Sequence, residues 1–440
     1  MELKIEKLVY GGEGLGRLAD EKTGRAKAVF VPFVAPGEVV EAKVIEEKPG
    51  FARATAERVL HPSPARIEPA CQYFLRCGGC QYQHIEYPEQ VRAKAQILEE
   101  TLARTARLML SHPVQTHSAE PLHYRNRTRM RVVHDPEFAI GYYRYGSHSL
   151  LAVEECPISS PLINRALKVL WDLGRGERVN EAIREVQFFA NDDDSKLLVE
   201  FFTEHDIDPN SVRPTIEVLR GTLAEVVGVA VFPGAPADDS EDQRAPLTRA
   251  KSSPGAFFGD RSLVYGTKNH EYQVSAGAFF QVNRFLLDGL IETVTSGRSG
   301  KMAVDLYSGG GFFSLPLAKQ FQQVIAVEAS THSYADLRTN APQNVKAIRV
   351  ATEEFLRSEV KRYAPEFIVV DPPRAGLGEN TARLLGSTSA PRVTYVSCDP
   401  ATLARDMKVL IESGFRAEEA HVFDLFPQTF HLESVLHLAR

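Results

Sequence analysis

Five cysteines carry the most informative chemistry in this 440-residue chain. Four of them form a C-x5-C-x2-C run followed, after residues 81–155, by a cysteine before a proline. Three clustered thiolates and one distant thiolate can close a four-coordinate site. A zinc ribbon usually offers two close pairs, so this spacing favours an iron-sulfur cluster over zinc. The predicted ligands are Cys71, Cys77, Cys80 and Cys156.

The fifth cysteine, Cys398, ends the apolar segment RVTYVS and precedes a helix expected from about Ala401. Strand ends of an open α/β sheet face the ligand crevice. A thiol near a helix N-terminus is expected to have a lowered pKa. A thiolate there can add to carbon 6 of a uracil and make carbon 5 nucleophilic enough to accept a methyl group. The alternative is a small apolar residue that finishes a strand.

Methylation at carbon 5 also needs a base that removes the carbon 5 proton. Glu433 lies between Leu432 and Ser434 on a predicted C-terminal strand. A glutamate at such a position usually faces solvent. Combined with Cys398 and with Asp371, which ends the strand EFIVVD, it becomes the best candidate for the base.

The segment KMAVDLYSGGGFFSLPLA predicts a strand, a glycine-rich turn and the start of a helix. Gly309 and Gly311 allow a ligand to approach the backbone closely. Ser314 stands where the dinucleotide fingerprint requires glycine, which disfavours NAD. Asp305 and Glu328 end two successive strands, and Glu328 can accept hydrogen bonds from ribose hydroxyls. Two carboxylates without a phosphate-binding loop suit S-adenosylmethionine, which is cationic at its sulfonium and ammonium groups.

Three domains are expected to position these residues. Residues 1–60 contain short strands and glycine-rich turns, the pattern of a small five-stranded barrel that suits a solubility module or an oligonucleotide-binding module equally well. Residues 61–274 predict an α+β domain with the iron-sulfur site, an amphipathic helix over residues 86–110 and a loop insertion at 232–255. Residues 275–440 alternate strands with helices and predict a doubly wound α/β domain.

Four arginines recur at every second position in HYRNRTRMRVVHD. If this segment is a strand, all four side chains leave one face and must be neutralised by RNA phosphates or by carboxylates elsewhere in the fold. Tyrosines in the following GYYRYG suit base stacking. The residues concerned are Arg125, Arg127, Arg129 and Arg131.

Composition adds broad limits. Charged residues make up 25% and hydrophobic residues 43%, which excludes wholesale disorder and fibrous architectures. The net charge of −6 does not indicate nucleic acid, so RNA would have to meet a local basic patch. No apolar run reaches the ~18 residues of a membrane span, and the N-terminus does not read as a signal peptide. We therefore expect a cytoplasmic monomer with no membrane partner and no obligate protein partner.

Together these motifs resemble the RNA uracil-5 methyltransferases that carry an N-terminal TRAM barrel and an iron-sulfur cluster, similar to the 23S ribosomal RNA enzymes. The resemblance covers nearly the whole chain and includes AFFQVN, DLYSGGG, DPPRAG, SCDPATLARD and HLES. It implies a class I S-adenosylmethionine-dependent methyltransferase fold, Cys398 as nucleophile, Glu433 as base and a 4Fe-4S cluster on the four clustered cysteines. It also implies contacts to the cofactor or target base from Gln281, Tyr307, Glu328 and Asp371.

The sequence departs from that family at three places. Phe312 replaces an asparagine after the glycine turn, SCDP replaces SCNP, and the insertion at 232–255 is extra. The implied partner is structured RNA, with 23S ribosomal RNA favoured and uridine 54 of transfer RNA as the alternative. A DNA cytosine-5 methyltransferase is disfavoured because Asp371-Pro372-Pro373 holds the place of its nucleophile. A third hypothesis, from another functional class, is a non-catalytic RNA-binding iron-sulfur protein.

Overall fold

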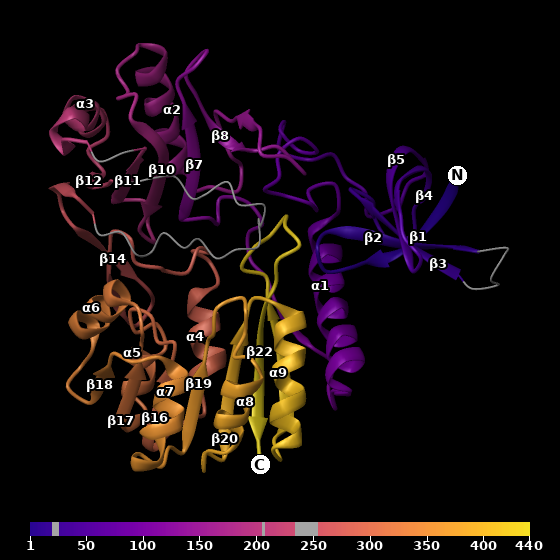
Figure 1. Cartoon of the computed structure of the whole chain (residues 1–440), viewed down its shortest axis with the longest axis vertical. Helices are drawn as coiled ribbons and strands as arrows, with labels where there is room; N and C mark the ends of the chain where they lie inside the picture. Colours follow the sequence, from indigo (N-terminus) through magenta and orange to yellow (C-terminus); the bar gives the residue numbers. More distant parts are fainter. Residues whose placement is uncertain (20–25, 205–206, 234–253) are drawn as a thin grey trace.

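The computed structural model describes residues 1–19, 26–204, 207–233 and 254–440. Most of the predicted insertion, residues 234–253, therefore lies outside the described residues. The described residues form a closed barrel, a seven-stranded sheet, a two-stranded sheet and an eight-stranded sheet (Figure 1). No helix among them is long and apolar enough to cross a membrane.

The N-terminal barrel has the strand order β1-β2-β3-β5-β4. Its strands are β1 (Glu2–Leu8), β2 (Glu13–Ala19), β3 (Ala26–Pro32), β4 (Val39–Glu47) and β5 (Phe51–His61). Alternate residues of β1 point inward, where Leu3 and Ile5 pack in the barrel core. The β1–β2 turn contains Gly11 and Gly12, whose φ angles of +107° and +93° favour glycine. The barrel predicted from the sequence is confirmed.

The seven-stranded sheet has the order β13-β12-β11-β10-β7-β8-β9. Its strands are β7 (Arg127–Val133), β8 (Ala139–Tyr143), β9 (Leu150–Ala152), β10 (Ile183–Ala190), β11 (Leu197–Thr203), β12 (Val226–Phe232) and β13 (Ala256–Gly259). Helices α2 (Pro161–Arg175) and α3 (Arg213–Thr222) bury their apolar faces against it. Ser160 caps α2 by accepting a hydrogen bond from the Ile163 N–H. The hairpin of β14 (Ser262–Gly266) and β15 (Glu271–Ser275) follows.

The eight-stranded sheet has the order β18-β17-β16-β19-β20-β22-β21-β6, and β22 is antiparallel to both of its neighbours. Its strands are β6 (Gln115–His117), β16 (Gly300–Leu306), β17 (Phe321–Val327), β18 (Val345–Ile348), β19 (Phe367–Val370), β20 (Arg392–Ser397), β21 (Arg416–Phe423) and β22 (Glu433–Ala439). The accompanying helices are α4 (Leu287–Thr295), α5 (Ser314–Ala318), α6 (Thr331–Asn340), α7 (Thr352–Ser358), α8 (Glu379–Gly386) and α9 (Pro400–Glu412). The chain order reverses between β16 and β19, where doubly wound sheets bind ligands. The predicted doubly wound domain is confirmed.

The helix predicted over residues 86–110 is α1 (Tyr87–Thr101), continued by one π-helical stretch (Leu102–Ala106). Arg107 closes it in a left-handed conformation. The helix packs against α9 (Figure 1). Strand β6 then pairs in parallel with β21 at the sheet edge. This early segment thus lies on the C-terminal sheet. The division at residues 60 and 274 stays a prediction.

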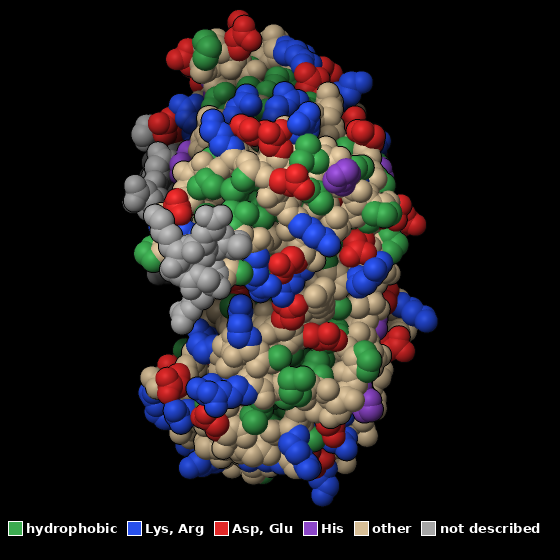
Figure 2. All heavy atoms as spheres, turned by 90° about the vertical axis from the view of Figure 1, so that its right-hand side faces the viewer, with side chains coloured by type: hydrophobic (Ala, Val, Ile, Leu, Met, Phe, Trp, Pro, Cys, Tyr) green, Lys and Arg blue, Asp and Glu red, His purple; other side chains and the backbone are tan. Residues whose placement is uncertain are grey.

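Three of the four alternating arginines form ion pairs within the protein, whereas no carboxylate pairs with Arg125 among the described residues. Arg127 pairs with Glu200 at 3.1 Å, and Arg131 pairs with Glu185 at 2.8 Å. Arg129 also contacts Glu185. Both carboxylates lie on neighbouring strands of the same sheet. Of the two alternatives, neutralisation by carboxylates of the fold therefore applies to these three arginines. On the face seen in Figure 2, basic and acidic side chains are interspersed.

Candidate active site

The register of β20 and β22 places the predicted nucleophile beside the predicted base. Ser397 pairs with Ser434, and the Ser434 hydroxyl donates a hydrogen bond of 2.9 Å to the Ser397 carbonyl. The ladder ends at this pair, and Cys398 and Glu433 are the residues next to it on the two strands, close enough for the Glu433 charge to act on the Cys398 thiol. The Cys398 thiol is half-buried, and Glu433 is only 4% exposed.

The pKa of the Cys398 thiol is raised to about 12, first by burial and then by the Glu433 and Asp371 carboxylates, with Arg374 opposing them. The lowered pKa expected from the sequence is therefore wrong for the protein alone. Helix α9 does begin beside the thiol, but Asp399 caps it: its carboxylate accepts hydrogen bonds from the N–H groups of Ala401 (3.0 Å) and Thr402 (2.9 Å). These first amides stabilise the carboxylate and not a thiolate.

The carboxyl groups of Asp305, Asp371 and Glu433 lie near one another at the strand ends, where Asp305 and Glu433 are buried and Asp371 is half-buried. Burial raises the pKa of Asp305 and of Asp371 to about 7, and the charge of Asp371 adds to the effect on Asp305. Burial and the charge of Asp371 also raise the pKa of Glu433 well above its usual value. Asp305 accepts a 2.5 Å hydrogen bond from the Ser314 hydroxyl, while its second oxygen is buried without a partner. Such a cluster is stabilised by a bound cation.

The glycine turn after β16 has an unusual backbone. Tyr307, Gly309 and Gly311 have φ angles of +60°, +55° and +98°. The Gly309 N–H donates a 2.9 Å hydrogen bond to the Glu328 carboxylate, which also accepts one of 2.6 Å from the Ser330 N–H. Glu328, at the end of β17, thus orients the turn from the neighbouring strand. A Cβ at Gly311 would lie 2.8 Å from a Leu315 methyl carbon, so this position must remain glycine.

Phe312, the departure after the glycine turn, packs into the core. Its ring contacts Tyr272 and Phe280 at centroid distances of 5.7 and 5.8 Å, and the Tyr272 hydroxyl donates to the Phe312 carbonyl at 3.0 Å. The side chain therefore serves packing and offers no polar contact to a ligand.

The segment AFFQVN joins the site through its backbone. Gln281 is buried, and its carbonyl accepts a 3.2 Å hydrogen bond from the Asn126 amide. The Asn283 amide donates to the Leu425 carbonyl at 3.1 Å. The segment is thereby fixed to the loop that precedes Glu433.

That loop, residues 424–432, is held by buried side chains of α1 that sequence reasoning missed. The Lys94 ammonium donates to Asp424 at 2.6 Å and to the Phe426 carbonyl at 3.1 Å, and both members of the ion pair are fully buried. The Gln90 and Gln428 side chains are hydrogen-bonded at 3.0 Å. The only sequence signal was a lysine among the apolar positions of an amphipathic helix. These contacts fix where β22, and with it Glu433, begins.

The structure gathers the four clustered cysteines. Burial raises the pKa of Cys77 to about 11, and the neighbouring Cys156 and Cys71 raise it further. Burial raises the pKa of Cys80 as well, and all three other cysteines add to it. These mutual effects on the thiol pKa values place the sulfurs near one another, as the predicted four-ligand site requires.

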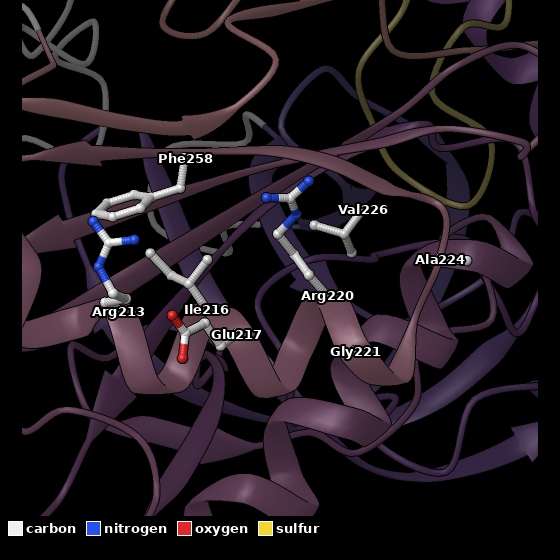
Figure 3. A pocket seen from close by; sticks show the side chains of 8 residues that line it. All are labelled: Arg213, Ile216, Glu217, Arg220, Gly221, Ala224, Val226 and Phe258. Carbon is white, nitrogen blue, oxygen red and sulfur yellow. The ribbon is translucent and has the colours of Figure 1, made fainter.

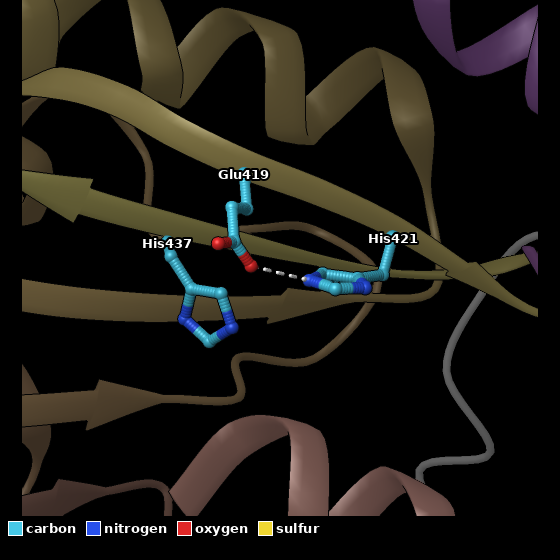
Figure 4. Close-up of side chains that lie close together, drawn as sticks. All are labelled: Glu419, His421 and His437. Atoms are coloured by element: carbon cyan, nitrogen blue, oxygen red, sulfur yellow. Dashed lines mark ion pairs between the residues drawn. The ribbon is translucent and has the colours of Figure 1, made fainter. Parts of the chain in front are cut away.

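A second group of possible ligands, Glu419, His421 and His437, lies on β21 and β22, with ligand atoms within 4.8 Å of one another (Figure 4). Protein partners already engage them. His421 contacts Glu419 at 3.4 Å and His117 of β6 at 3.1 Å. His437 is hydrogen-bonded to the Thr394 hydroxyl at 2.8 Å. We interpret the group as the network that fastens β6 to the sheet edge.

A hollow of about 390 Å³ lies between α3 and the strands β12 and β13 (Figure 3). The Arg213 guanidinium stacks over the Phe258 ring, 4.8 Å from its centroid. The hollow is lined by Arg213, Ile216, Glu217, Arg220, Gly221, Ala224, Val226 and Phe258. None of the predicted site residues contributes to it.

A doubly wound sheet with a glycine turn and buried carboxylates at its switch point defines an S-adenosylmethionine-dependent methyltransferase fold. The family described as tRNA (uracil-5-)-methyltransferase matches residues 86–440, and the TRAM domain matches residues 1–56. The chain belongs to the tRNA (uracil-5-)-methyltransferase family and is an RNA uracil-5 methyltransferase with an N-terminal TRAM domain. The family predicted from the motifs is confirmed.

Individual relatives match along the whole chain. An uncharacterized RNA methyltransferase of Aquifex aeolicus is 33% identical over 99% of this chain and 97% of its own length. A protein of Halomonas elongata named 23S rRNA (uracil(1939)-C(5))-methyltransferase RlmD is 31% identical over 99% of this chain and 88% of its own length. The crystal structure of Pyrococcus abyssi tRNA (uracil-54, C5)-methyltransferase with S-adenosyl-L-homocysteine has a TM-score of 0.75, with 23% identity and 99% coverage of both chains. It shows that the fold is shared from end to end.

Proposed function

We propose that this protein methylates carbon 5 of one uridine in 23S ribosomal RNA, with Cys398 as nucleophile and Glu433 as base. The single observation that carries the mechanism is the β20–β22 register, which joins these two residues at the end of the sheet. The choice of ribosomal RNA is supported by the Halomonas elongata relative. Uridine 54 of transfer RNA is the second candidate, favoured by the name of the solved structure with the same fold.

The target uridine leaves its stack, because carbon 6 is inaccessible within a helix. The Cys398 thiolate forms a bond to carbon 6, and the electron pair of the C5–C6 double bond moves to carbon 5. Carbon 5 would then bond to the electrophilic methyl group that bound S-adenosylmethionine supplies, and the methyl–sulfur bond would break to leave S-adenosylhomocysteine. Glu433 then takes the carbon 5 proton, the double bond re-forms, and the sulfur–carbon 6 bond breaks to release Cys398. Arg374 lies close to both groups and favours their charged forms.

The strand ends fit S-adenosylmethionine by charge. Asp305 and Asp371 are held with raised pKa values in the absence of a cation, and one Asp305 oxygen has no partner. A sulfonium and an ammonium group would relieve this, and the glycines of the turn leave room for a ligand at the backbone. We assign the contacts to the cofactor or the target base to Gln281, Tyr307, Gly309, Gly311, Glu328 and Asp371.

The four clustered cysteines would hold a 4Fe-4S cluster. A cube of four irons takes one thiolate at each iron, and a C-x5-C-x2-C run with one distant cysteine is less typical of a zinc site. The raised thiol pKa values also fit a metal site. Burial disfavours the thiolate forms of these cysteines, and bound iron would stabilise them. Such a closed site has a structural role.

Trapping with RNA that contains 5-fluorouridine tests the mechanism. Fluorine at carbon 5 cannot leave as a proton, so a covalent protein–RNA adduct should accumulate only when S-adenosylmethionine is present. No adduct would contradict the proposed function. The target is tested by mass spectrometry of ribosomal and transfer RNA from a strain that lacks the protein. Loss of 5-methyluridine from transfer RNA alone would replace the first candidate with the second.

A further inference from the structure

The turn between β1 and β2 of the TRAM barrel contacts the nucleophile segment. The Tyr10 hydroxyl donates a hydrogen bond of 3.3 Å to the Cys398 carbonyl, 388 residues away in the sequence. Its ring packs edge-on against Phe430, with centroids 5.4 Å apart and planes at 84°. Phe430 precedes Glu433 by three residues. One side chain of the barrel therefore touches the segments that carry both predicted reacting groups.

The Cys398 backbone needs an external partner. The ladder with β22 ends at the pair Ser397 and Ser434, so the Cys398 carbonyl lies beyond it. The next helix offers little, because Pro400 has no N–H and the Ala401 and Thr402 amides bind Asp399. A hydroxyl that reaches in from the barrel supplies the missing donor.

The surroundings of Tyr10 keep its hydroxyl protonated, so that it can donate the hydrogen bond. Burial raises its pKa, and the nearby Asp399 and Cys398 groups raise it further, so the hydroxyl stays protonated. Gly12 makes the close approach possible. Any other residue at this position, where φ is +93°, would place its Cβ 2.8 Å from Gln81 and 3.5 Å from Phe430. The Phe430 N–H in turn donates to the Gln81 side chain at 3.3 Å.

We propose that Tyr10 is a positioning residue that sets the orientation of the Cys398 thiol, so that the TRAM barrel contributes to the chemical step as well as to the protein's contact with RNA. This inference rests on the proposed function of Cys398 as nucleophile. Its signature is a slower formation of the bond to carbon 6 without weaker RNA binding, because the hydroxyl contacts the protein backbone and not the substrate.

The test uses the full chain with the Tyr10→Phe substitution, which removes the hydroxyl and keeps the ring against Phe430. The matched control is Tyr363→Phe, because that hydroxyl accepts a 3.0 Å hydrogen bond from Lys346 on an exposed surface away from the strand ends. Three quantities are measured: the single-turnover rate of adduct formation with 5-fluorouridine RNA, the RNA dissociation constant and the melting temperature.

We expect Tyr10→Phe to slow adduct formation roughly tenfold, the effect of one lost hydrogen bond, with RNA affinity and melting unchanged. The control should match the wild type. Gly12→Ala, which would push the turn away from Gln81, should also slow the step. A Tyr10→Phe rate equal to that of the wild type would overturn the inference, as would a loss of RNA affinity that accounts for the slower rate. If the wild type itself forms no adduct, the proposed function fails instead.

Discussion

Two places in the molecule bury cysteine sulfur, and they differ in the charges around it. Each of the three cysteines in the C-x5-C-x2-C run has a raised pKa, mainly through burial, and its charged neighbours include other thiols. Cys398 also has a raised pKa, but its neighbours are the carboxylates Glu433 and Asp371, with Arg374 opposing them. Burial raises the thiol pKa at both sites. The groups that stabilise the thiolate must therefore differ between the two sites.

In the proposed assignment, iron supplies permanent positive charge to the four-cysteine site. At Cys398, as the proposed nucleophile, the thiolate is needed only during turnover, when the substrate takes up its electron pair. A metal ion bound to the Cys398 sulfur would block that reaction, whereas the nearby Arg374 guanidinium favours the thiolate without bonding to it. The comparison teaches that a buried cysteine is assigned from its neighbours and not from its burial.

Among the predictions that test this difference, Cys398→Ala has the largest expected effect. We expect methyl transfer to fall by roughly 10⁴-fold or more, because no other group can add to carbon 6. Transfer of a tritiated methyl group measures it, and iron content should stay at the wild-type level. Methyl transfer that persists in this variant would remove Cys398 from the nucleophile role.

Glu433→Gln should have the next largest effect. The glutamine keeps the shape but cannot take the carbon 5 proton, so turnover should fall by about 10²- to 10⁴-fold while a methylated protein–RNA adduct accumulates. Gel electrophoresis of the denatured complex with unmodified RNA would show it. Rapid turnover without the adduct would assign the proton to another base.

Cys77→Ser tests the assignment of the four-cysteine site. Loss of one of four ligands should release iron, bleach the visible absorption and lower the melting temperature. Cys398→Ala is the matched control, since it also removes one half-buried thiol. Unchanged iron content and melting in Cys77→Ser would contradict the four-ligand assignment.

The smallest effect concerns pH. Only the thiolate reacts, and the pKa of Cys398 is raised to about 12, so its reactive fraction increases tenfold with each pH unit below that value. The single-turnover rate of adduct formation should therefore rise between pH 6.5 and 8.5 (about a hundredfold at most), while iron content stays constant. A flat rate profile would mean that the thiolate is already formed, as the helix N-terminus alone suggested.

The sequence predicted the barrel and the doubly wound sheet because glycine turns and apolar runs are local signals. It also identified Asp305, Glu328, Asp371 and Cys398, since strand ends of such a sheet converge on one crevice. The juxtaposition of Glu433 with Cys398, by contrast, came from the structure through strand register.

What could not be predicted depends on partners far away in the chain. The acidic partners Glu185 and Glu200 lie 54 to 73 residues from the arginines that they neutralise. The raised pKa of Cys398 comes first from burial, and carboxylates that follow or belong to two other strands, Asp371 and Glu433, add to it. Tyr10 carried no signal at all, because its role depends on where one turn of the barrel lies.

The buried pair of Lys94 and Asp424 sets a condition on how the protein is made. The ribosome adds Asp424 330 residues after Lys94, a delay of roughly 20 to 70 seconds at 5 to 20 residues per second. During that time the apolar face of α1 waits without α9 and its ammonium group without a counter-charge. Helix α1 therefore acquires its native packing only after nearly the whole chain has been made.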